Sequence, residues 1–319
     1  MYVLRIYMLM IILHLTVSQI IIASYTKNCT YDNHPKAPEV YYINLKKSHK
    51  RRQVIKQLLA TMQLRYFRVD AVSSNSVYVP HDLTRPLHNT ALSFADVCKY
   101  RTKETIVNST QTMTATNKTH LVRGICSIGI LWTELYCTMS HLVAIYNAVH
   151  STTAISNYAI IMEDDIHIPI STDFNALAES APKDFGILQL LSVNSGKVSE
   201  LWELYTKQHT LWSKHNDAHF WSTGIYLINR ERMRPIIDAI VRIDPVYPHI
   251  LQYTLISTKP RYRKYKLPPE CTVTATATKP SICIQSHDIV ADRYIYAMNT
   301  TYMSCLPIAY VQTGFKTTV

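Results

Sequence analysis

Three consecutive acidic residues are the feature of this sequence best suited to chemistry. Glu163, Asp164 and Asp165 directly follow residues 158–162, an apolar run of strand length. Three adjacent carboxylates repel one another, and burial makes that repulsion costly unless a cation offsets it. Oxygen ligands suit a hard divalent ion such as Mn²⁺ or Mg²⁺, which takes substrate phosphates as further ligands. The triplet indicates either a metal-assisted phosphate site or a solvated acidic turn.

Basic residues near the first predicted helix suit the same chemistry. Lys47, Arg51 and Arg52 follow an apolar strand and open a helix, where backbone N–H groups and the helix dipole favour anions. A diphosphate would then bind between this helix start and the metal. The alternative is an exposed basic helix start that binds nothing.

Two further positions are candidates from their residue types. Ser140 and His141 lie on a predicted helix that precedes the acidic triplet. They do not form a hydrolase-type pair, because adjacent helical residues do not face each other, and a buried, hydrogen-bonded histidine is the commoner role. Asp292, late in the chain, is a candidate general base.

The elements that must position these residues follow an α/β pattern. A strand at 40–45, an amphipathic helix at 51–62 and a strand at 66–69 form a βαβ unit, which implies a parallel sheet. In open α/β sheets, ligands bind beyond the carboxyl ends of the strands, where the acidic triplet lies. Further strands are expected at 158–162, 186–193 and 220–229, and helices around 139–149 and over 230–240.

Composition restricts the class of protein. With 319 residues, 47% hydrophobic and 17% charged, the chain has enough apolar residues for a large core. The glycine-rich nucleotide-binding fingerprints are absent, so a nucleotide would be held another way. The net charge of +11 is not concentrated in a recognisable nucleic-acid module, and we expect no nucleic-acid partner.

The N-terminal residues predict that the chain enters the secretory pathway. Residues 6–23 are almost wholly apolar, so 1–24 is either a cleaved signal peptide or a type II signal anchor that would hold the chain in the membrane. Residues 25–39 read as a stem, followed by one domain over 40–319. Four N-x-[ST] sequons and 7 Cys suit an oxidising, glycosylating lumen of the ER or Golgi; the sequons are at Asn28, Asn108, Asn117 and Asn299.

Two stretches interrupt the α/β pattern. Residues 73–120 are polar and carry two of the sequons, and residues 245–285 are rich in Pro and Thr with weak periodicity. We interpret both as insertions and assign no regular structure to the first.

Five short segments, in order along the chain, match the motifs of one enzyme family. They are residues 42–45 (YINL) with Arg51 and Arg52, residues 67–72 (FRVDAV), 137–142 (CTMSHL), 160–166 (IIMEDDI) and 223–230 (TGIYLINR). Together they resemble family-25 glycosyltransferases, which include lipooligosaccharide and collagen galactosyltransferases.

That resemblance implies a GT-A-like fold, a mostly parallel Rossmann-related sheet flanked by helices. It also implies an inverting hexosyltransferase with a nucleotide-sugar donor, commonly UDP-galactose, a divalent metal (Mn²⁺ or Mg²⁺), and a glycan or glycoprotein acceptor. By resemblance, Asp164 and Asp165 bind the metal and Asp292 is the catalytic base. The donor is bound by Asn44, Arg52, Ser140, His141 and Glu163.

Two other functions stay open. Lys46 stands where the family usually has Asp, and Tyr136 where it has Gly, so an inactive member acting as a lumenal or surface binding protein is the main alternative. A lumenal phosphodiesterase using the same acidic cluster is the third. Release of UDP from nucleotide sugars separates the first function from both.

Overall fold

The computed structural model describes residues 37–79, 118–126, 132–169, 171–215, 221–256 and 290–312. The predicted N-terminal segment, three of the sequons (Asn28, Asn108 and Asn117) and most of the two predicted insertions lie outside these residues. Among the described helices, none is long and apolar enough to cross a membrane.

The predicted βαβ unit is confirmed. It consists of β1 (Glu39–Asn44), α2 (His49–Thr61) and β2 (Tyr66–Asp70), and the two strands pair in parallel. The helix forms because Ile55 and Leu59 are one turn apart and both are buried, which gives α2 an apolar stripe against the sheet.

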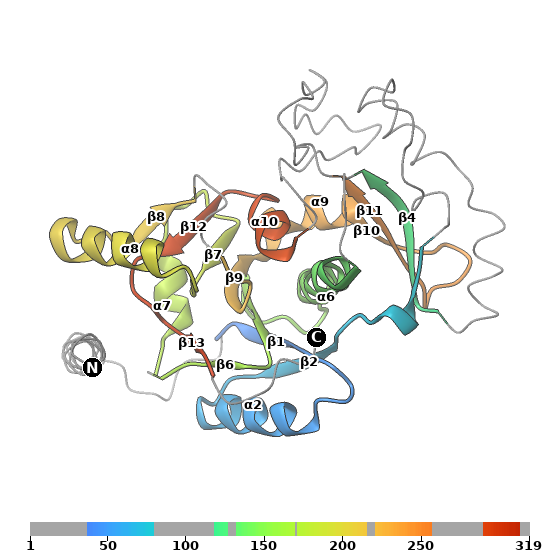
Figure 1. The fold of residues 1–319 in the computed structure, drawn as a ribbon, viewed down its shortest axis with the longest axis horizontal. Helices are drawn as coiled ribbons and strands as arrows, with labels where there is room; N and C mark the ends of the chain where they lie inside the picture. The colour runs from blue at the N-terminus through green and yellow to red at the C-terminus, as the bar shows by residue number, and fades with distance from the viewer. Residues whose placement is uncertain are drawn as a thin grey trace, which may run out of the picture. The chain divides into compact units, whose positions relative to one another are not determined.

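The main sheet has seven strands in the order β2-β1-β5-β9-β7-β12-β8. Five of them run in one direction, while β9 and β8 run in the opposite one. This mostly parallel α/β sheet confirms the predicted GT-A-like fold class (Figure 1). The strands not yet located are β5 (Tyr158–Glu163), β7 (Ile187–Gln189), β8 (Trp212–Lys214), β9 (Ile225–Asn229) and β12 (Thr301–Ser304).

Alternate residues of the strands supply two hydrophobic cores, one on each face of this sheet. Tyr41 and Ile43 of β1 pack with the face that carries α6, whereas Val40 and Tyr42 pack with the face that carries α2. Figure 1 shows α2 and α6 on opposite sides of β1 and β2. Each fully buried side chain of this size stabilises the fold by about 1.5–3 kcal/mol. The helices are α6 (Trp132–Val149), α9 (Arg230–Ile240) and α10 (Ala291–Tyr296) on the first face, and α7 (Phe174–Glu179), which joins α2 on the second.

Two predicted strands, those at 186–193 and 220–229, are shorter than expected, and the helices α7, α8 (Ser195–Gln208) and α10 were not predicted. β7 ends at Gln189, whose side-chain amide donates to the carbonyls of Leu191 and Ser222. These side-chain bonds satisfy main-chain carbonyls that a longer strand would have paired in its ladder. Next comes α8, whose first turn is capped by the side chain of Asn194.

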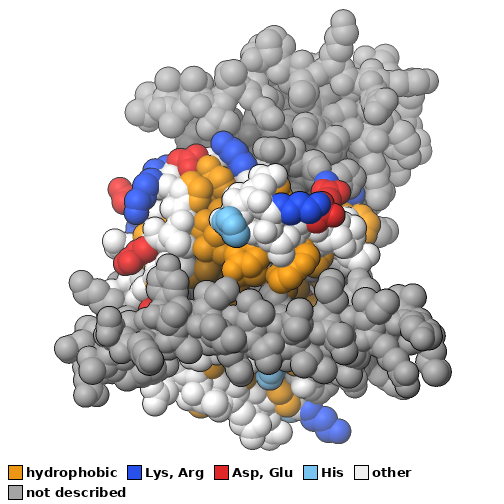
Figure 2. All heavy atoms as spheres, turned by 90° about the vertical axis from the view of Figure 1, so that its left-hand side faces the viewer, with side chains coloured by type: hydrophobic (Ala, Val, Ile, Leu, Met, Phe, Trp, Pro, Cys, Tyr) orange, Lys and Arg blue, Asp and Glu red, His pale blue; other side chains and the backbone are white. Residues whose placement is uncertain are grey.

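The outer surface of α8 is polar. Lys197 pairs with Glu200 and Lys207 with Glu203, both at helical spacing. Figure 2 views the molecule from the side that faces left in Figure 1, where α8 lies, and shows charged side chains beside a band of hydrophobic ones.

A second sheet joins the described ends of the two predicted insertions. Its order is β10-β11-β4-β3, and it packs beside α6 and α9. Residues 73–79 hold a short helical turn and β3, so part of the stretch to which no structure was assigned is regular. The strands are β3 (Val77–Tyr78), β4 (His120–Cys126), β10 (Val241–Ile243) and β11 (Leu251–Ile256).

Candidate active site

The acidic triplet lies where the strand pattern predicts. β5 ends at Glu163, and Asp164 and Asp165 form the turn that leads into β6 (Ile166–His167). Because β1, β2 and β5 are parallel, the same edge of the sheet also carries Asn44, the last residue of β1. Side chains from neighbouring strands therefore converge on the acidic turn.

Asn44 is fully buried and oriented by two arginines. The Nε atoms of Arg52 and Arg68 donate to its Oδ1 at 3.0 and 3.1 Å. With its oxygen held by these donors, the Asn44 amide nitrogen points to Asp164 and donates to Oδ2 at 2.6 Å. The predicted donor-binding residues Asn44 and Arg52 are thus part of one network with the predicted metal ligand Asp164.

Arg51 bridges the two aspartates. Its Nη1 lies 3.1 Å from Asp164 Oδ1 and 3.3 Å from Asp165 Oδ2. All three side chains are at most 17% exposed, so the bridge is largely shielded from water. Burial and then the charge of Glu163 raise the pKa of Asp165 to about 6, with the Arg51 charge acting in the opposite direction. The resemblance assigned donor binding to Arg52, but Arg51 is the arginine that contacts the two aspartates.

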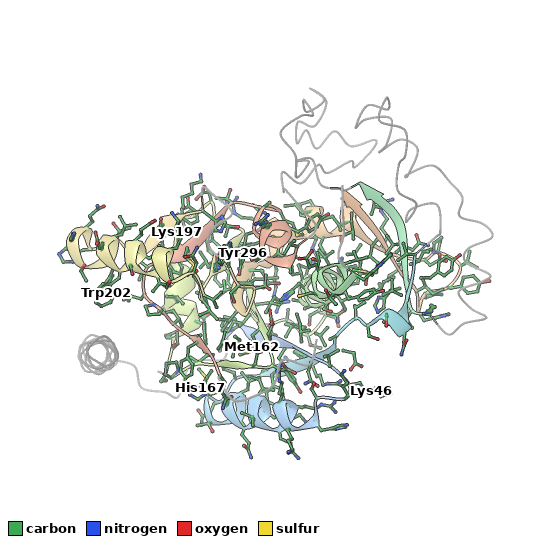
Figure 3. The ribbon with its side chains drawn as sticks, viewed as in Figure 1. Lys46, Met162, His167, Lys197, Trp202 and Tyr296 are labelled. Carbon is green, nitrogen blue, oxygen red and sulfur yellow. The ribbon has the colours of Figure 1, made fainter. Side chains whose placement is uncertain are left out.

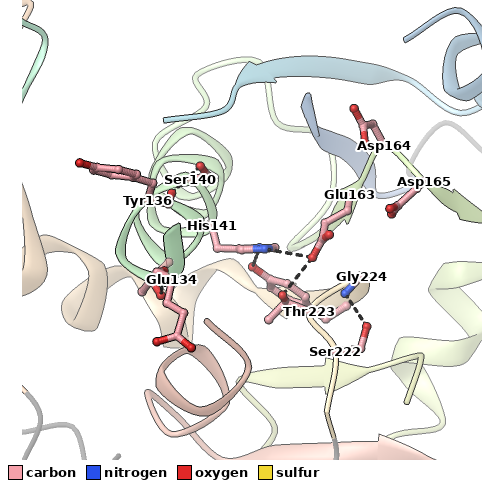
Figure 4. Close-up of polar contacts among 12 residues, drawn as sticks. Glu134, Tyr136, Ser140, His141, Glu163, Asp164, Asp165, Ser222, Thr223 and Gly224 are labelled. Carbon is pink, nitrogen blue, oxygen red and sulfur yellow. Dashed lines mark hydrogen bonds and ion pairs between the residues drawn. The ribbon is translucent and has the colours of Figure 1, made fainter. Parts of the chain in front are cut away.

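Glu163 is turned away from the aspartates and towards α6 (Figure 4). Its Oε1 accepts a hydrogen bond from Thr223 Oγ1 at 3.0 Å and lies 3.4 Å from Nε2 of the buried His141. The other ring nitrogen of His141 is 3.1 Å from the hydroxyl of Tyr226. Desolvation raises the pKa of Glu163, but the His141 and Thr223 hydrogen bonds and the Arg51 charge outweigh it, so the net shift is downward. Glu163 is therefore a charged anchor for the site.

Ser140 and His141 have different partners, as expected for adjacent helical residues. The Ser140 hydroxyl accepts from the amide of Val72 at 2.9 Å and donates to the carbonyl of Tyr136 at 2.7 Å. It fastens α6 to the chain just after β2, while His141 supports Glu163.

Asp292 lies close to the same group of residues. It is in the first turn of α10, the helix whose Tyr296 donates to the carbonyl of Ser222 at 2.7 Å. Its Oδ1 is buried without a hydrogen-bond partner among the described residues. Burial raises the pKa of Asp292, and the nearby Arg293 charge and the backbone amides reduce that shift. The next residue, Thr223, donates to Glu163, so the turn at residues 222–223 contacts both α10 and the acidic end of β5.

The turn at residues 222–224 combines a residue of positive φ with a closely packed glycine. Ser222 has a positive φ of 106°, and Tyr296 donates to its carbonyl at 2.7 Å. A Cβ on Gly224 would lie 2.6 Å from Ile166, which follows the acidic turn. A larger residue at position 224 would therefore require the end of the Ile166 side chain to shift.

A family comparison decides what kind of site this is. The model of glycosyltransferase family 25 (LPS biosynthesis protein) matches residues 37–248, which contain the acidic turn and its neighbours other than α10 and the C-terminal segment at 310–312. The chain belongs to glycosyltransferase family 25. It is therefore a hexosyltransferase-type enzyme, and sugar transfer requires a donor and an acceptor. No match was found among curated proteins.

The acidic turn of this glycosyltransferase suits a single cation. In the part of the chain that the structure describes, no three His, Cys, Asp or Glu side chains are arranged to hold a metal ion. Two carboxylates, Asp164 and Asp165, do converge, since both contact one guanidinium nitrogen of Arg51. A pair of carboxylates fits a divalent ion that takes its other ligands from water and from a substrate diphosphate.

The transferase also uses its C-terminal segment at this edge. β13 (Tyr310–Val311) pairs with β6, and the amide of Gln312 donates to the carbonyl of Asp165 at 2.7 Å. Neither this contact nor the roles of Arg68, Thr223 and Tyr226 were predicted. Thr223 and Tyr226 lie in the TGIYLINR motif, so that motif did carry a signal for two of them.

Proposed function

We propose that this transferase moves a hexose, with galactose the first candidate, from a UDP-sugar to a glycan or glycoprotein hydroxyl with inversion at the anomeric carbon. Mn²⁺ or Mg²⁺ would assist. The observation that carries the proposal is that Asp164 and Asp165 converge at the carboxyl edge of the sheet, where both contact the guanidinium of Arg51. Ligands of open α/β folds bind at this edge.

The residues around the turn have separate roles in this proposal. Asp164 and Asp165 hold the divalent ion, which when bound neutralises charge on the leaving diphosphate. Asn44 fixes the orientation of Asp164, and Arg51 and Arg52 supply positive charge next to the diphosphate. His141 and Thr223 keep Glu163 in place.

Asp292 is the proposed general base. The acceptor oxygen attacks the anomeric carbon as the bond to the diphosphate oxygen breaks, and the acceptor proton moves to the Asp292 carboxylate. The upward shift of its pKa makes Asp292 a better proton acceptor than an ordinary aspartate, provided that it is ionised before the reaction.

We place the enzyme in the lumen of the secretory pathway, either anchored by residues 6–23 or soluble after cleavage of residues 1–24. The apolar N-terminal segment and the four sequons support this placement. Protease protection of the chain in intact microsomes would test it.

The direct test is release of UDP from a panel of UDP-hexoses with Mn²⁺. We expect Asp164→Asn and Asp165→Asn to abolish release. Asp184→Asn is the matched control, because this aspartate bonds Tyr302 on a different part of the surface. Wild-type turnover in both site variants would show that the site is assigned wrongly.

An inactive, glycan-binding member of the family is the second candidate. The observation in its favour is that Arg51 already occupies the position between the two aspartates, where it contacts both carboxylates. Calorimetry separates the two: binding of a glycan with no binding of UDP or Mn²⁺ would favour this candidate.

A further inference from the structure

Exposed apolar side chains gather at the same edge of the sheet as the carboxylates. The described residues include eight large hydrophobic ones that are exposed, and two of these, Val193 and Trp221, follow β7 and precede β9. Trp221 is 44% exposed and Val193 is 52% exposed. Exposed apolar residues that lie together and are rimmed by polar groups are typical of ligand-binding surfaces, whereas singly scattered ones are not.

The backbone holds these two residues together. The amide of Val193 donates to the carbonyl of Trp221 at 3.1 Å. The next residue, Ser222, is fixed in its positive-φ conformation by Tyr296 and by Gln189, whose side-chain nitrogen lies 3.1 Å from the Ser222 carbonyl. Such strain costs on the order of 1–3 kcal/mol and is concentrated at functional sites. Trp221 is therefore presented from a fixed position.

Strand order separates this apolar surface from the basic residues. Asn44 and the arginines that contact it lie on the β2–β1 side of the acidic turn, whereas Trp221 and Val193 lie on its β9–β7 side. The diphosphate would bind on the first side. The second side holds α10, which carries Asp292 in its first turn and whose Tyr296 donates to the carbonyl of Ser222, the residue next to Trp221.

We infer that Trp221, together with Val193, forms the acceptor subsite. A hexose has an apolar face of C–H groups and a rim of hydroxyls, so it can stack on the indole while a hydroxyl points away towards Asp292. The inference rests on the proposed function, since it assigns the second substrate of that reaction.

Kinetics test the inference directly. With a UDP-hexose that supports turnover, Mn²⁺, and the methyl glycosides of galactose and glucose as acceptors, Trp221→Ala raises the acceptor KM by about tenfold or more. The donor KM, and the slow release of UDP without acceptor, stay at the wild-type values. Trp221→Phe, which keeps an aromatic ring, loses much less and also serves if the Ala variant does not fold.

Fluorescence gives a second readout. In the wild type, added methyl glycoside quenches tryptophan emission. Trp221→Phe loses this quenching although calorimetry still shows binding. The control, Trp202→Phe, keeps it, because Trp202 lies on α8, to one side of Met162 near the end of β5 (Figure 3).

The outcomes distinguish the two ideas. An unchanged acceptor KM in Trp221→Ala, while Asp164→Asn abolishes transfer, would overturn the subsite and leave the proposed function intact. Quenching through Trp221 without turnover of any UDP-hexose would support the saccharide site and overturn the proposed function.

Discussion

Replacing Arg51 by methionine should make the enzyme bind Mn²⁺ more tightly. Arg51 donates to both Asp164 and Asp165, so a metal ion that takes these carboxylates must first displace the guanidinium. A hydrogen bond to a charged group contributes about 1.5–3 kcal/mol. Because the displaced arginine recovers bonds to water, we assign the whole bridge about this value, which is a roughly 10- to 150-fold gain in affinity.

Calorimetric titration of Mn²⁺ into the donor-free protein measures this gain without depending on turnover. Arg51→Lys should be intermediate, since an ammonium keeps the charge but lacks the planar fork that reaches two carboxylates. Arg65→Met removes a positive charge that contacts Thr153, away from the site, and should leave the affinity unchanged. Equal or weaker binding in a correctly folded Arg51→Met variant would refute the reasoning.

Three further predictions concern stability and modification. Arg230→Met should lower the free energy of unfolding by about 3 kcal/mol, because the fully buried Glu39 carboxylate loses its close partner and keeps only the Ile155 amide and a contact with Arg65 at 3.8 Å. Tm should fall by roughly 10 °C, and Glu39→Gln in the same chain should restore part of the loss. Asn299 should stay unglycosylated in a secreted preparation, as peptide mass spectrometry can check, because its amide donates to a main-chain carbonyl and its side chain lies against Gly186. Burial lowers the pKa of His120 to about 4, so the unfolded chain takes up this proton first, and stability should fall by about 2–3 kcal/mol as the pH drops from 6.5 to 4. His120→Gln should remove that part of the pH dependence in denaturant titrations.

Local patterns predicted the elements that build the sheet edge. The βαβ unit, β5 and α9 each have a periodicity or apolar run that specifies them without help from the rest of the chain. The position of Glu163, Asp164 and Asp165 followed from the run that ends at Met162 and from the rule for open α/β sheets.

Other features depend on contacts that local patterns do not encode. Nothing in the sequence of β9 says that it runs antiparallel between β5 and β7, and the partners β4 and β11 are far apart in the chain. Arg51 and Arg52 are adjacent and equally basic, but helix geometry turns successive side chains by about 100°, so only one of them reaches the aspartates.

The place of β12 and β13 has a consequence for how the enzyme is made. β12 lies inside the main sheet between β7 and β8, and the amide of Gln312 is bonded to Asp165. A ribosome releases the chain from the N-terminus, so the acidic turn emerges long before the segments that brace it. The nascent chain must therefore pass through a stage in which β7 has an open edge and Asp165 lacks its backbone support. Activity should arise only after residues 301–312 have left the ribosome, because the main sheet and the support of Asp165 are incomplete until then.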